Sequence, residues 1–320
     1  MPNESSVLAL SGGVGGAKLC LGLSQIVAGS SLKVVVNTAD DFEHLGLTIC
    51  PDIDTLLYTL SGRNNRELGW GLAGESWQAM DALEALGGET WFRLGDRDLA
   101  THLWRREAIS QGRGLLELTA ELAQSMGVGA EILPMSAQAV RTRVHTAQGD
   151  LPFQHYFVKY QCQPEVTGFS FSGLDTAKPN PQLMQLLQEA PPAVIVICPS
   201  NPFVSVDPIL QLPGLWPALR DCSAPVIAVS PIVAGMAIKG PAAKMMAELG
   251  MPVTAEAVAA HYLSSYPGLI DCFVIDESDA TLAPMIEKQG MNTAVAATVM
   301  RSDDDKRALA GEVLRLAEAG

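Results

Sequence analysis

The chain has little positive charge and no long apolar segment. It carries 21 Lys and Arg residues against 35 Asp and Glu, a formal net charge of −14. Because nucleic acids and anionic membranes bind basic surfaces, this balance argues against both as partners. No window approaches the roughly 18 apolar residues of a membrane span, and residues 1–13 lack the basic region of a signal peptide. We therefore expect a cytoplasmic protein.

Metal-binding cysteine patterns are also absent. The six cysteines form no Cys-x-x-Cys pair and no Cys/His spacing, so we expect reduced, mostly buried thiols. The composition, 48% apolar and 18% charged residues, argues against disorder. At 320 residues the chain is long enough for one large α/β domain or for two ordinary ones.

Short apolar runs recur along the chain, each followed by small or polar residues. They cover residues 7–13, 33–41, 193–202, 225–232, 272–279 and 293–300. Continuous apolar runs are typical of strands buried on both faces of a parallel sheet. Helical patterns lie between them, and the last helix presents Leu309, Val313, Leu316 and Ala317 on one face. This alternation predicts a Rossmann-like, doubly wound α/β fold with a mostly parallel sheet.

The middle of the chain departs from this pattern. Residues 62–128 show helical periodicity, and residues 140–163 predict a β-hairpin with its turn at Gly149 and Asp150. We therefore predict a nucleotide-binding core of residues 1–62 and 176–320. Residues 63–175 are then a helical and β-hairpin insertion that caps the core.

The predicted fold also indicates where a ligand binds. In open parallel sheets, ligands lie in the crevice at the carboxyl ends of the strands. Compact hydrogen-bonding residues stand at most of these predicted ends, namely 11–13, 37–41, 199–202, 230–231 and 276–278. The alternative is that such residues only terminate strands, as they often do.

A glycine-rich segment follows the first predicted strand. Residues 10–19, LSGGVGGAKL, place four glycines in five positions before a helical pattern. A glycine inside a helix or strand costs roughly 0.5 to 1 kcal/mol relative to alanine, so this cluster predicts a tight turn that something approaches closely. A strand, a bare turn and a helix N-terminus together favour a phosphate or diphosphate near Gly13 to Lys18. Close packing of strand against helix is the simpler alternative.

This segment differs from two common phosphate-binding motifs. It lacks the residue order of a Walker A loop. It is only a partial dinucleotide fingerprint, because Lys18 occupies the sixth position counted from Gly13 and Asn37 stands where a ribose-binding acid is expected. An NAD-dependent oxidoreductase is therefore disfavoured.

Acidic residues follow the second predicted strand. Asp40 and Asp41 end it, and Asp52 and Asp54 follow Pro51. A buried group of carboxylates is unfavourable unless it holds a cation or a proton. Mg²⁺ typically takes one or two carboxylates together with phosphate oxygens. Alternatively, Asp52 or Asp54 only caps the helix predicted over residues 54–60.

A segment of mixed charge spans residues 91–109. Arg93, Arg97 and His102 lie there among Asp96 and Asp98, where a helix is expected to begin near Asp98. Opposite charges this close in sequence usually form a salt-bridged surface turn, and a lone histidine at helical spacing is more often packed than catalytic.

Seven segments taken together resemble one family. They are LSGGVGGAKLCLGL, VVVNTADD, CPDIDTLLYTLSG, RLGDRDLATH, ILPMS, PSNPFVSVDPIL and VIAVSPIVAG, in this order. The chain is similar to the CofD family, the 2-phospho-L-lactate transferases of coenzyme F-420 biosynthesis, including FbiA-type bacterial members. The resemblance implies a Mg²⁺-dependent Rossmann-like enzyme, commonly a homodimer. Such an enzyme moves a phospho-carboxylic-acid group from a guanosine diphospho donor to the terminal hydroxyl of the deazaflavin Fo and releases GMP.

The resemblance also implies roles for particular residues. It assigns Asp54 and Arg93 to the deazaflavin, with Asp54 orienting the hydroxyl or taking its proton, so that residues 63–175 form part of this site. Asp40 and Asp52 are the metal candidates. The residues expected to face the nucleotide or its phosphates are Gly12, Gly13, Gly15, Gly16, Lys18, Asn37, Ser200 and Asn201.

Two points stay open at the level of sequence. The donor carries 2-phospho-L-lactate, phosphoenolpyruvate or 3-phosphoglycerate, and no residue selects among them. The alternative function is a nucleotide-sugar-binding regulator of the YvcK type, which shares the glycine loop and performs no transfer. The segments CPDIDT and GDRD argue against that alternative.

Overall fold

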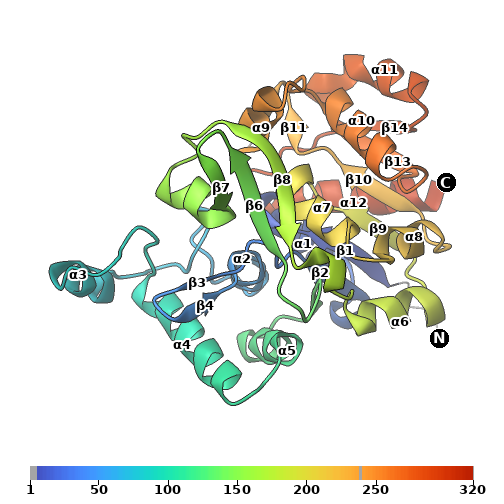
Figure 1. The fold of residues 1–320 in the computed structure, drawn as a ribbon. Coiled ribbons are helices and arrows are strands. Elements are labelled where there is room, and N and C mark those ends of the chain that lie inside the picture. Colours follow the sequence, from blue (N-terminus) through green and yellow to red (C-terminus); the bar gives the residue numbers. More distant parts are fainter. Residues whose placement is uncertain (1–5, 238–239, 320) are drawn as a thin grey trace.

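A seven-stranded parallel sheet forms the centre of the molecule (Figure 1). The computed structural model describes residues 6–237 and 240–319, so the predictions on residues 1–5 lie outside the described part. The sheet order is β14 (Thr293–Ala296), β13 (Cys272–Asp276), β10 (Val226–Val229), β9 (Val194–Ile197), β1 (Val7–Ser11), β2 (Leu32–Val36) and β5 (Glu131–Pro134). The chain starts at β1, builds outward on one side and then on the other. The switch point therefore lies between β1 and β9.

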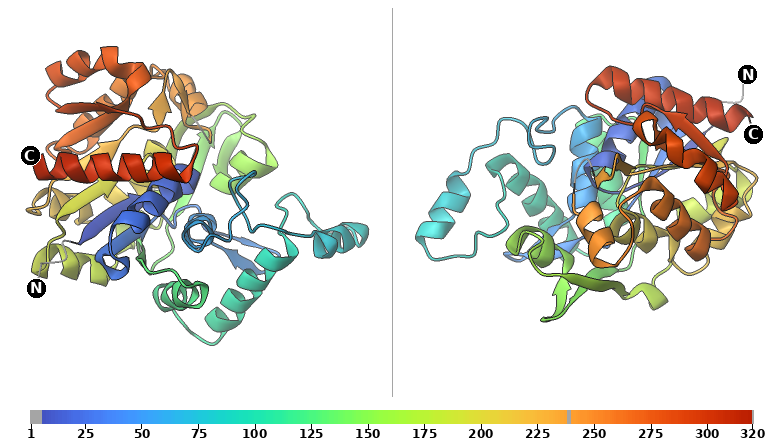
Figure 2. Two further views of the ribbon diagram at one scale, coloured as in Figure 1. Left: turned by 180° about the vertical axis from the view of Figure 1, so that it is seen from behind. Right: turned by 90° about the horizontal axis from the view of Figure 1, so that it is seen from above.

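Helices cover both faces of this sheet. Alternate strand residues supply two separate cores, with Leu8 and Leu10 in one and Val7 and Ala9 in the other. One face carries α1 (Gly13–Ile26), α2 (Pro51–Leu60), α5 (Leu115–Met126) and α12 (Asp303–Ala319). The opposite face carries α6 (Pro181–Glu189), α7 (Asp207–Leu210), α8 (Leu215–Arg220), α9 (Ala242–Glu248), α10 (Ala255–Ser265) and α11 (Ala283–Lys288). Figure 2 shows α12 running alongside α1. The doubly wound α/β prediction is confirmed.

The main sheet contains one strand from the predicted insertion. β5 pairs with β2, from Lys33 opposite Glu131 to Val36 opposite Pro134. This strand lies within the insertion predicted over residues 63–175. It has no strand signal in the sequence, because only Ile132 and Leu133 precede Pro134 and so short an apolar run is not distinctive. The division into a core and an insertion therefore stays a prediction, with β5 belonging to the central sheet.

Two helices of the insertion project away from the sheet (Figures 1 and 2). They are α3 (Gln78–Ala85) and α4 (Asp96–Ser110). The N-terminus of each helix is capped by an acidic residue that lies at the start of the other helix or just before it. Asp96 accepts hydrogen bonds from the backbone N–H groups of Gln78 and Ala79. Glu75 accepts from those of Arg97 and Asp98. Carboxylates that pair with the unsatisfied N–H groups of a helix N-terminus stabilise it, so these contacts fix the start of α4.

The predicted hairpin is present within a three-stranded antiparallel sheet. Its strands are β6 (Arg141–Thr146), β7 (Gly149–Pro152) and β8 (Val166–Ser172). The turn lies at residues 147–148, so the prediction of a Gly149-Asp150 turn is wrong and these two residues begin β7. Thr146 closes the two-residue turn, since its hydroxyl accepts from the N–H of Gln148 and donates to the carbonyl of Gly149.

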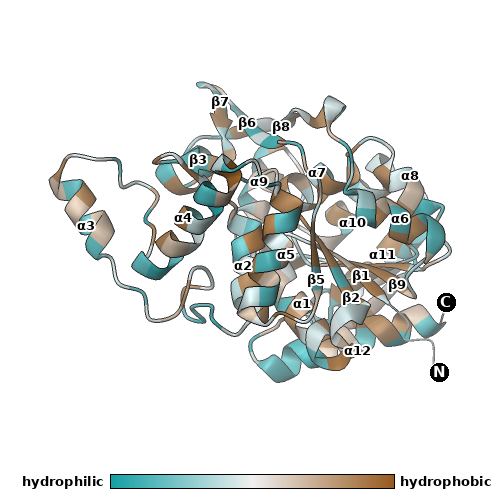
Figure 3. Ribbon diagram, turned by 90° about the horizontal axis from the view of Figure 1, so that it is seen from below, coloured by the Kyte–Doolittle hydropathy of each residue, from teal (hydrophilic) through white to brown (hydrophobic). Residues whose placement is uncertain are grey.

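The remaining elements are short. They are the hairpins β3 (Phe42–His44) with β4 (Leu47–Ile49) and β11 (Ile232–Val233) with β12 (Met236–Ala237), and the helical turns Gly29–Ser31, His155–Lys159, Leu174–Thr176, Pro202–Val206 and Glu277–Leu282. In Figure 3 the central strands are apolar and the surrounding helices expose polar faces. Within the described residues, none of the helices combines the length and apolarity that a membrane crossing needs. The six cysteines are unpaired, and Cys20, Cys50 and Cys198 are buried.

Candidate functional site

A cavity of about 490 Å³ opens at the carboxyl ends of the strands, beside the switch point. Strand-end residues that line it include Gly12, Asp40, Pro199, Ser200, Ser230 and Pro231. Four of the five predicted strand ends therefore meet at one cavity. The fifth does not line it, because Asp276 accepts hydrogen bonds from Ser278 and Thr298 and serves the fold there.

The glycine loop forms one end of this cavity. Gly13 has φ +64°, a backbone conformation that favours glycine, and it is the first residue of α1. Two loop N–H groups already have partners: that of Gly12 donates to Ser200 Oγ at 3.1 Å, and that of Gly13 donates to Asp52 Oδ1 at 2.8 Å. The N–H groups of Val14 and Gly15 follow in the first turn, where a helix supplies no partners of its own. An anion would therefore bind beside a carboxylate at this helix N-terminus.

Two of the loop glycines are required by close packing. A Cβ at Gly15 would lie 2.3 Å from the carbonyl oxygen of Pro199. A Cβ at Gly16 would lie 2.4 Å from Ser11 Oγ and 2.7 Å from Ser200 Oγ. The simpler packing interpretation thus holds for both, although Gly15 also lines the cavity. Main chain and small side chains form this end of the cavity.

Three other predicted phosphate residues take part in the framework around the loop. Asn37 is fully buried and is not among the cavity-lining residues. Lys18 lines the cavity and donates from Nζ to the Met300 carbonyl at 3.0 Å. Asn201 lines it as well, and its Oδ1 accepts from the N–H groups of Phe203 and Val204 at the start of a helical turn.

Asn37 acts through Asp52. Its Nδ2 donates to Asp52 Oδ2 at 2.9 Å and to the Val204 carbonyl at 3.2 Å, so Asn37 and Gly13 together hold the Asp52 carboxylate. Asp52 forms no cap on its own helix, whose N-terminal flanking residue is Cys50. The capping alternative is therefore wrong for Asp52. For Asp54 it is also wrong, because that side chain pairs with Arg105 instead.

Asp40 and Asp52 share the cavity wall and destabilise each other's charge. Burial raises the pKa of Asp52 to about 6, even though Asn37 and the Gly13 N–H stabilise the carboxylate. Burial and the charges of Asp52 and Asp41 raise the pKa of Asp40. Asp41 does not line the cavity, and burial raises its pKa to about 8.

These carboxylates suit a hard divalent cation. Two acids that line one cavity and repel each other are stabilised by a cation between them. Among the described residues, no group of three or more His, Cys, Asp or Glu side chains is arranged to hold a metal. Two carboxylates completed by phosphate and water oxygens match the usual surroundings of Mg²⁺. The residues present therefore fit that ion.

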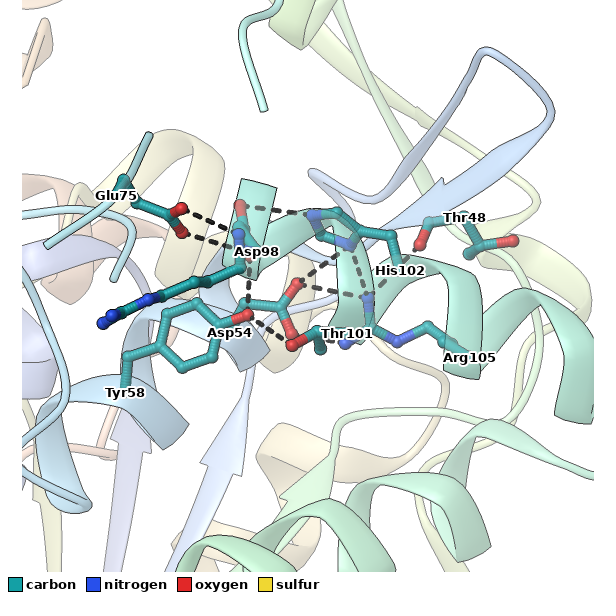
Figure 4. Close-up of polar contacts among 9 residues, drawn as sticks. Thr48, Asp54, Tyr58, Glu75, Asp98, Thr101, His102 and Arg105 are labelled. Atoms are coloured by element: carbon teal, nitrogen blue, oxygen red, sulfur yellow. Dashed lines mark hydrogen bonds and ion pairs between the residues drawn. The ribbon is translucent and has the colours of Figure 1, made fainter. Parts of the chain in front are cut away.

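A network of buried charges forms another part of the cavity wall (Figure 4). Asp54 is buried on α2 and pairs with the guanidinium of Arg105 on α4, whose side chain is 1% exposed. Both carboxylate oxygens accept from this one guanidinium, Oδ1 from one terminal nitrogen and Oδ2 from the other at 3.1 Å. Burial alone would lower the pKa of Arg105, but the adjacent Asp54 charge raises it. Arg105 therefore remains charged.

The network continues along α4. His102 Nε2 lies 3.3 Å from Asp98 Oδ2, and Tyr58 donates its hydroxyl to Asp98 Oδ1 at 2.6 Å. Burial opposes the charge of Asp98, yet the contacts with His102 and Tyr58 bring its pKa below the usual value. His102 is packed, as expected of a lone histidine at helical spacing, because its side chain is buried. Helix α4 begins at Asp96, two residues before the predicted start.

Arg93 lies at the rim of the cavity. Its guanidinium pairs with Asp81 at 2.6 Å and lies 5.4 Å from the centre of the Trp77 ring, with 45% of the side chain exposed. The salt-bridged surface interpretation is thus confirmed for Arg93. Apolar side chains line the same cavity and are called the apolar wall below: Leu68, Trp70, Phe92, Phe153 and Phe157.

Sequence reasoning missed Arg105 and this apolar wall. Arg105 stands next to Arg106 in a run that looks solvent-exposed, and only the fold brings it to Asp54, 51 residues earlier. The signal that was available is helical spacing, because His102 and Arg105 follow Asp98 at intervals that place all three on one face. Trp70 and Phe92 come from two irregular segments, whereas Phe153 and Phe157 come from the helical segment after β7, where their rings stack. No pattern along the sequence connects these three segments.

Comparisons with known proteins give matches over nearly the whole chain. The sequence model of the family described as 2-phospho-L-lactate transferase CofD matches residues 7–314. The chain is 38% identical over 317 residues to the phosphoenolpyruvate transferase of Streptomyces griseus subsp. griseus, covering 98% of each protein. It is 36% identical over 309 residues to the 2-phospho-L-lactate transferase of Methanosarcina mazei, covering 97% of this chain and 99% of that protein.

Solved structures share the fold at low sequence identity. A crystal structure of a UPF0052-family protein from Bacillus halodurans matches with a TM-score of 0.65 at 16% identity, covering 98% of this chain and 100% of that one. At this identity the likeness concerns the fold alone.

Proposed function

The chain belongs to the CofD family, and from this membership we propose that it is a transferase of coenzyme F-420 biosynthesis. It moves a phospho-carboxylic-acid group from a guanosine diphospho-linked donor to the terminal hydroxyl of the deazaflavin Fo and releases GMP. The names of the relatives favour phosphoenolpyruvate or 2-phospho-L-lactate as the transferred group, and 3-phosphoglycerate is the third candidate.

One observation carries this proposal. A single cavity is lined both by a glycine-rich helix N-terminus and by an apolar wall with buried charges. The first, the donor end, suits a diphosphate, and the second, the acceptor end, suits a flat heteroaromatic ring with hydrogen-bonding edges. A reaction between two such substrates needs both ends to open into one space.

The chemistry is a displacement at phosphorus. The hydroxyl oxygen of Fo forms a bond to the phosphorus that bears the acid group, the bond to the GMP oxygen breaks, and the hydroxyl proton passes to Asp54 or to solvent. Such a reaction needs alignment and charge neutralisation more than covalent participation by the protein. Asp54 orients the attacking hydroxyl, since its two oxygens are held in place by Arg105. The first turn of α1 and Lys18 bind the diphosphate.

A metal completes the donor end in this proposal. Asp40 and Asp52 would hold Mg²⁺, which when bound would supply positive charge to the diphosphate and to the leaving phosphate. The Gly13 N–H and the Asn37 side chain set the position of Asp52 by donating hydrogen bonds to its carboxylate. The same arrangement relieves the conflict between Asp52 and an anion at the N-terminus of α1.

Product analysis tests the function. The protein is incubated with Mg²⁺, Fo and each of the three guanosine donors, and products are identified by mass. We expect GMP and one phosphodiester-linked deazaflavin, with EDTA stopping the reaction. No product from any donor, together with tight binding of a nucleotide sugar, would favour a YvcK-type regulator instead.

The assembly state is a second proposal. We infer a homodimer from the family resemblance alone, and analytical ultracentrifugation measures it directly. A single species at the mass of one chain, 33.9 kDa, would contradict it.

A further inference from the structure

Arg105 lies directly behind the cavity wall. Asp54, Asp98 and His102 line the cavity, whereas Arg105 does not. Its side chain is 1% exposed, although it belongs to a helix that projects from the sheet. An arginine in this position cannot touch a bound substrate. It can act only through the side chains in front of it.

The contacts of Arg105 fix the orientation of Asp54. One terminal nitrogen, Nη1, donates to Asp54 Oδ2 at 3.1 Å and to the Thr48 carbonyl at 3.2 Å, while Nη2 donates to Oδ1. A planar guanidinium that binds both oxygens of a carboxylate sets its plane as well as its position. The bond to Thr48 anchors this pair to β4.

Arg105 also orders His102. Its Nη1 lies 3.3 Å from His102 Nδ1, and because an arginine nitrogen can only donate, Nδ1 is the acceptor. The remaining nitrogen, Nε2, then carries the ring proton and faces Asp98 at 3.3 Å. One guanidinium thus sets the orientation of two cavity-lining side chains, as Figure 4 shows.

We infer that Arg105 is a positioning residue of the transfer, holding Asp54 and His102 in the orientation that receives the deazaflavin acceptor. This inference rests on the proposed function. Lysine cannot replace it, because an ammonium group offers one centre of charge and does not define a plane. Arg105 is expected to affect the acceptor and to leave the donor unaffected.

The test is a double-mutant cycle with a matched control. The variants are Arg105→Lys, Arg105→Met, Asp54→Asn and the Arg105→Met/Asp54→Asn pair, with Arg106→Met as control, since Arg106 is exposed on the same helix. We expect Arg105→Lys and Arg105→Met to lower kcat/KM for Fo about 100-fold, the loss typical of a misplaced reacting group. The dissociation constant of the donor stays at the wild-type value in each variant. Arg106→Met behaves as wild type.

The cycle separates positioning from a general structural role. In the Asp54→Asn background, Arg105→Met should lower kcat/KM by much less than about 100-fold, because Asp54, one of the two groups that Arg105 positions, is already lost. Should Arg105→Met fail to fold, Arg105→Lys retains the charge, and the double variant carries no unpaired ion. Additive losses across the cycle, or a folded Arg105→Lys protein with wild-type kcat/KM, would overturn the inference.

Failure of the proposed function is recognised separately. A wild-type protein that forms no product with any donor refutes the transfer reaction. The inference is then decided by titrating the fluorescence of Fo with each protein. Wild-type binding that weakens at least about tenfold in Arg105→Lys supports the inference, whereas equal binding by both proteins, or none by wild type, overturns it.

Discussion

The two ends of the cavity differ in the kinds of groups that line them. The donor end combines main chain and small residues with the side chains of Lys18, Asp40 and Asp52, and Gly15 and Gly16 pack there against residues 199–200. The acceptor end consists of charged side chains from α2 and α4, joined by a buried Asp54–Arg105 pair. Backbone groups bind any phosphate placed at a helix N-terminus, whereas a network of oriented side chains recognises one molecule. The donor end therefore supplies the reaction type, and the acceptor end supplies the specificity.

The largest expected effect comes from disrupting the acceptor end. Asp54→Asn should lower turnover about 100-fold to 10,000-fold, the range typical of a residue that orients or deprotonates the nucleophile. Steady-state kinetics measures this loss, and donor affinity should change little. A folded variant with near-normal turnover would remove Asp54 from the mechanism.

The change also leaves Arg105 with a neutral partner. Breaking a buried ion pair costs about 3 to 5 kcal/mol, so the melting temperature of Asp54→Asn must be compared with that of the double variant that also replaces Arg105. A melting temperature restored in the double variant without restored turnover assigns the loss to chemistry.

Disruption of the donor end should have a smaller effect on turnover and a larger one on stability. A methyl group at Gly15 would lie 2.3 Å from the Pro199 carbonyl, which belongs to the backbone and cannot rotate away. We expect Gly15→Ala to lower the melting temperature and to weaken donor binding about tenfold or more, since the helix N-terminus shifts from the loop after β9. Calorimetry and donor titration measure the two effects.

Gly311→Ala is the matched control for that change. Gly311 lies inside α12 with no atom within 4 Å of an added Cβ, so alanine should raise stability slightly through its better helix propensity. Equal behaviour of the two variants would contradict the packing role of Gly15.

The raised pKa values of Asp52 and Asp41 predict that the stability of the protein depends on pH. Because burial raises the pKa of Asp52 to about 6 and that of Asp41 to about 8, the folded metal-free protein binds more protons than the unfolded chain between about pH 4 and 8. Its stability should therefore fall as pH rises through this window. Mg²⁺ should raise the melting temperature by a few degrees at pH 8 and by less at pH 5, where Asp52 is protonated.

Single variants show how much of this pH dependence comes from each carboxylate. Asp41→Asn should flatten the fall in stability between pH 6 and 8 while leaving the effect of Mg²⁺ in place. Asp52→Asn should abolish the effect of Mg²⁺. A metal-free melting temperature that rises with pH across the window would contradict the assignment.

The smallest effect is expected at the rim. Arg93→Gln removes an exposed pair with Asp81, and exposed pairs contribute about 0 to 1 kcal/mol, so kcat/KM for Fo should fall less than about fivefold. A much larger loss would show that Arg93 contacts the acceptor directly. The acceptor site would then extend to the outer face of α3.

The two ends also differ in how well the sequence predicts them. The glycine loop, the strand ends and the parallel sheet follow from local patterns, because backbone conformation and strand burial depend on residues near in sequence. Asn37 illustrates the limit. Its position at a strand end is predicted from the sequence, but its hydrogen bond to Asp52 and its absence from the cavity lining are not. Arg105 has no such local signal. Its meaning depends on a contact across 51 residues.

A crystal structure with a guanosine diphospho-linked donor and Fo bound together tests the account most directly. The account predicts the diphosphate at the first turn of α1, near Gly15 and Lys18, and the deazaflavin ring against the apolar wall with its ribityl hydroxyl facing Asp54. A diphosphate bound outside this cavity, or a deazaflavin remote from Asp54, would contradict it.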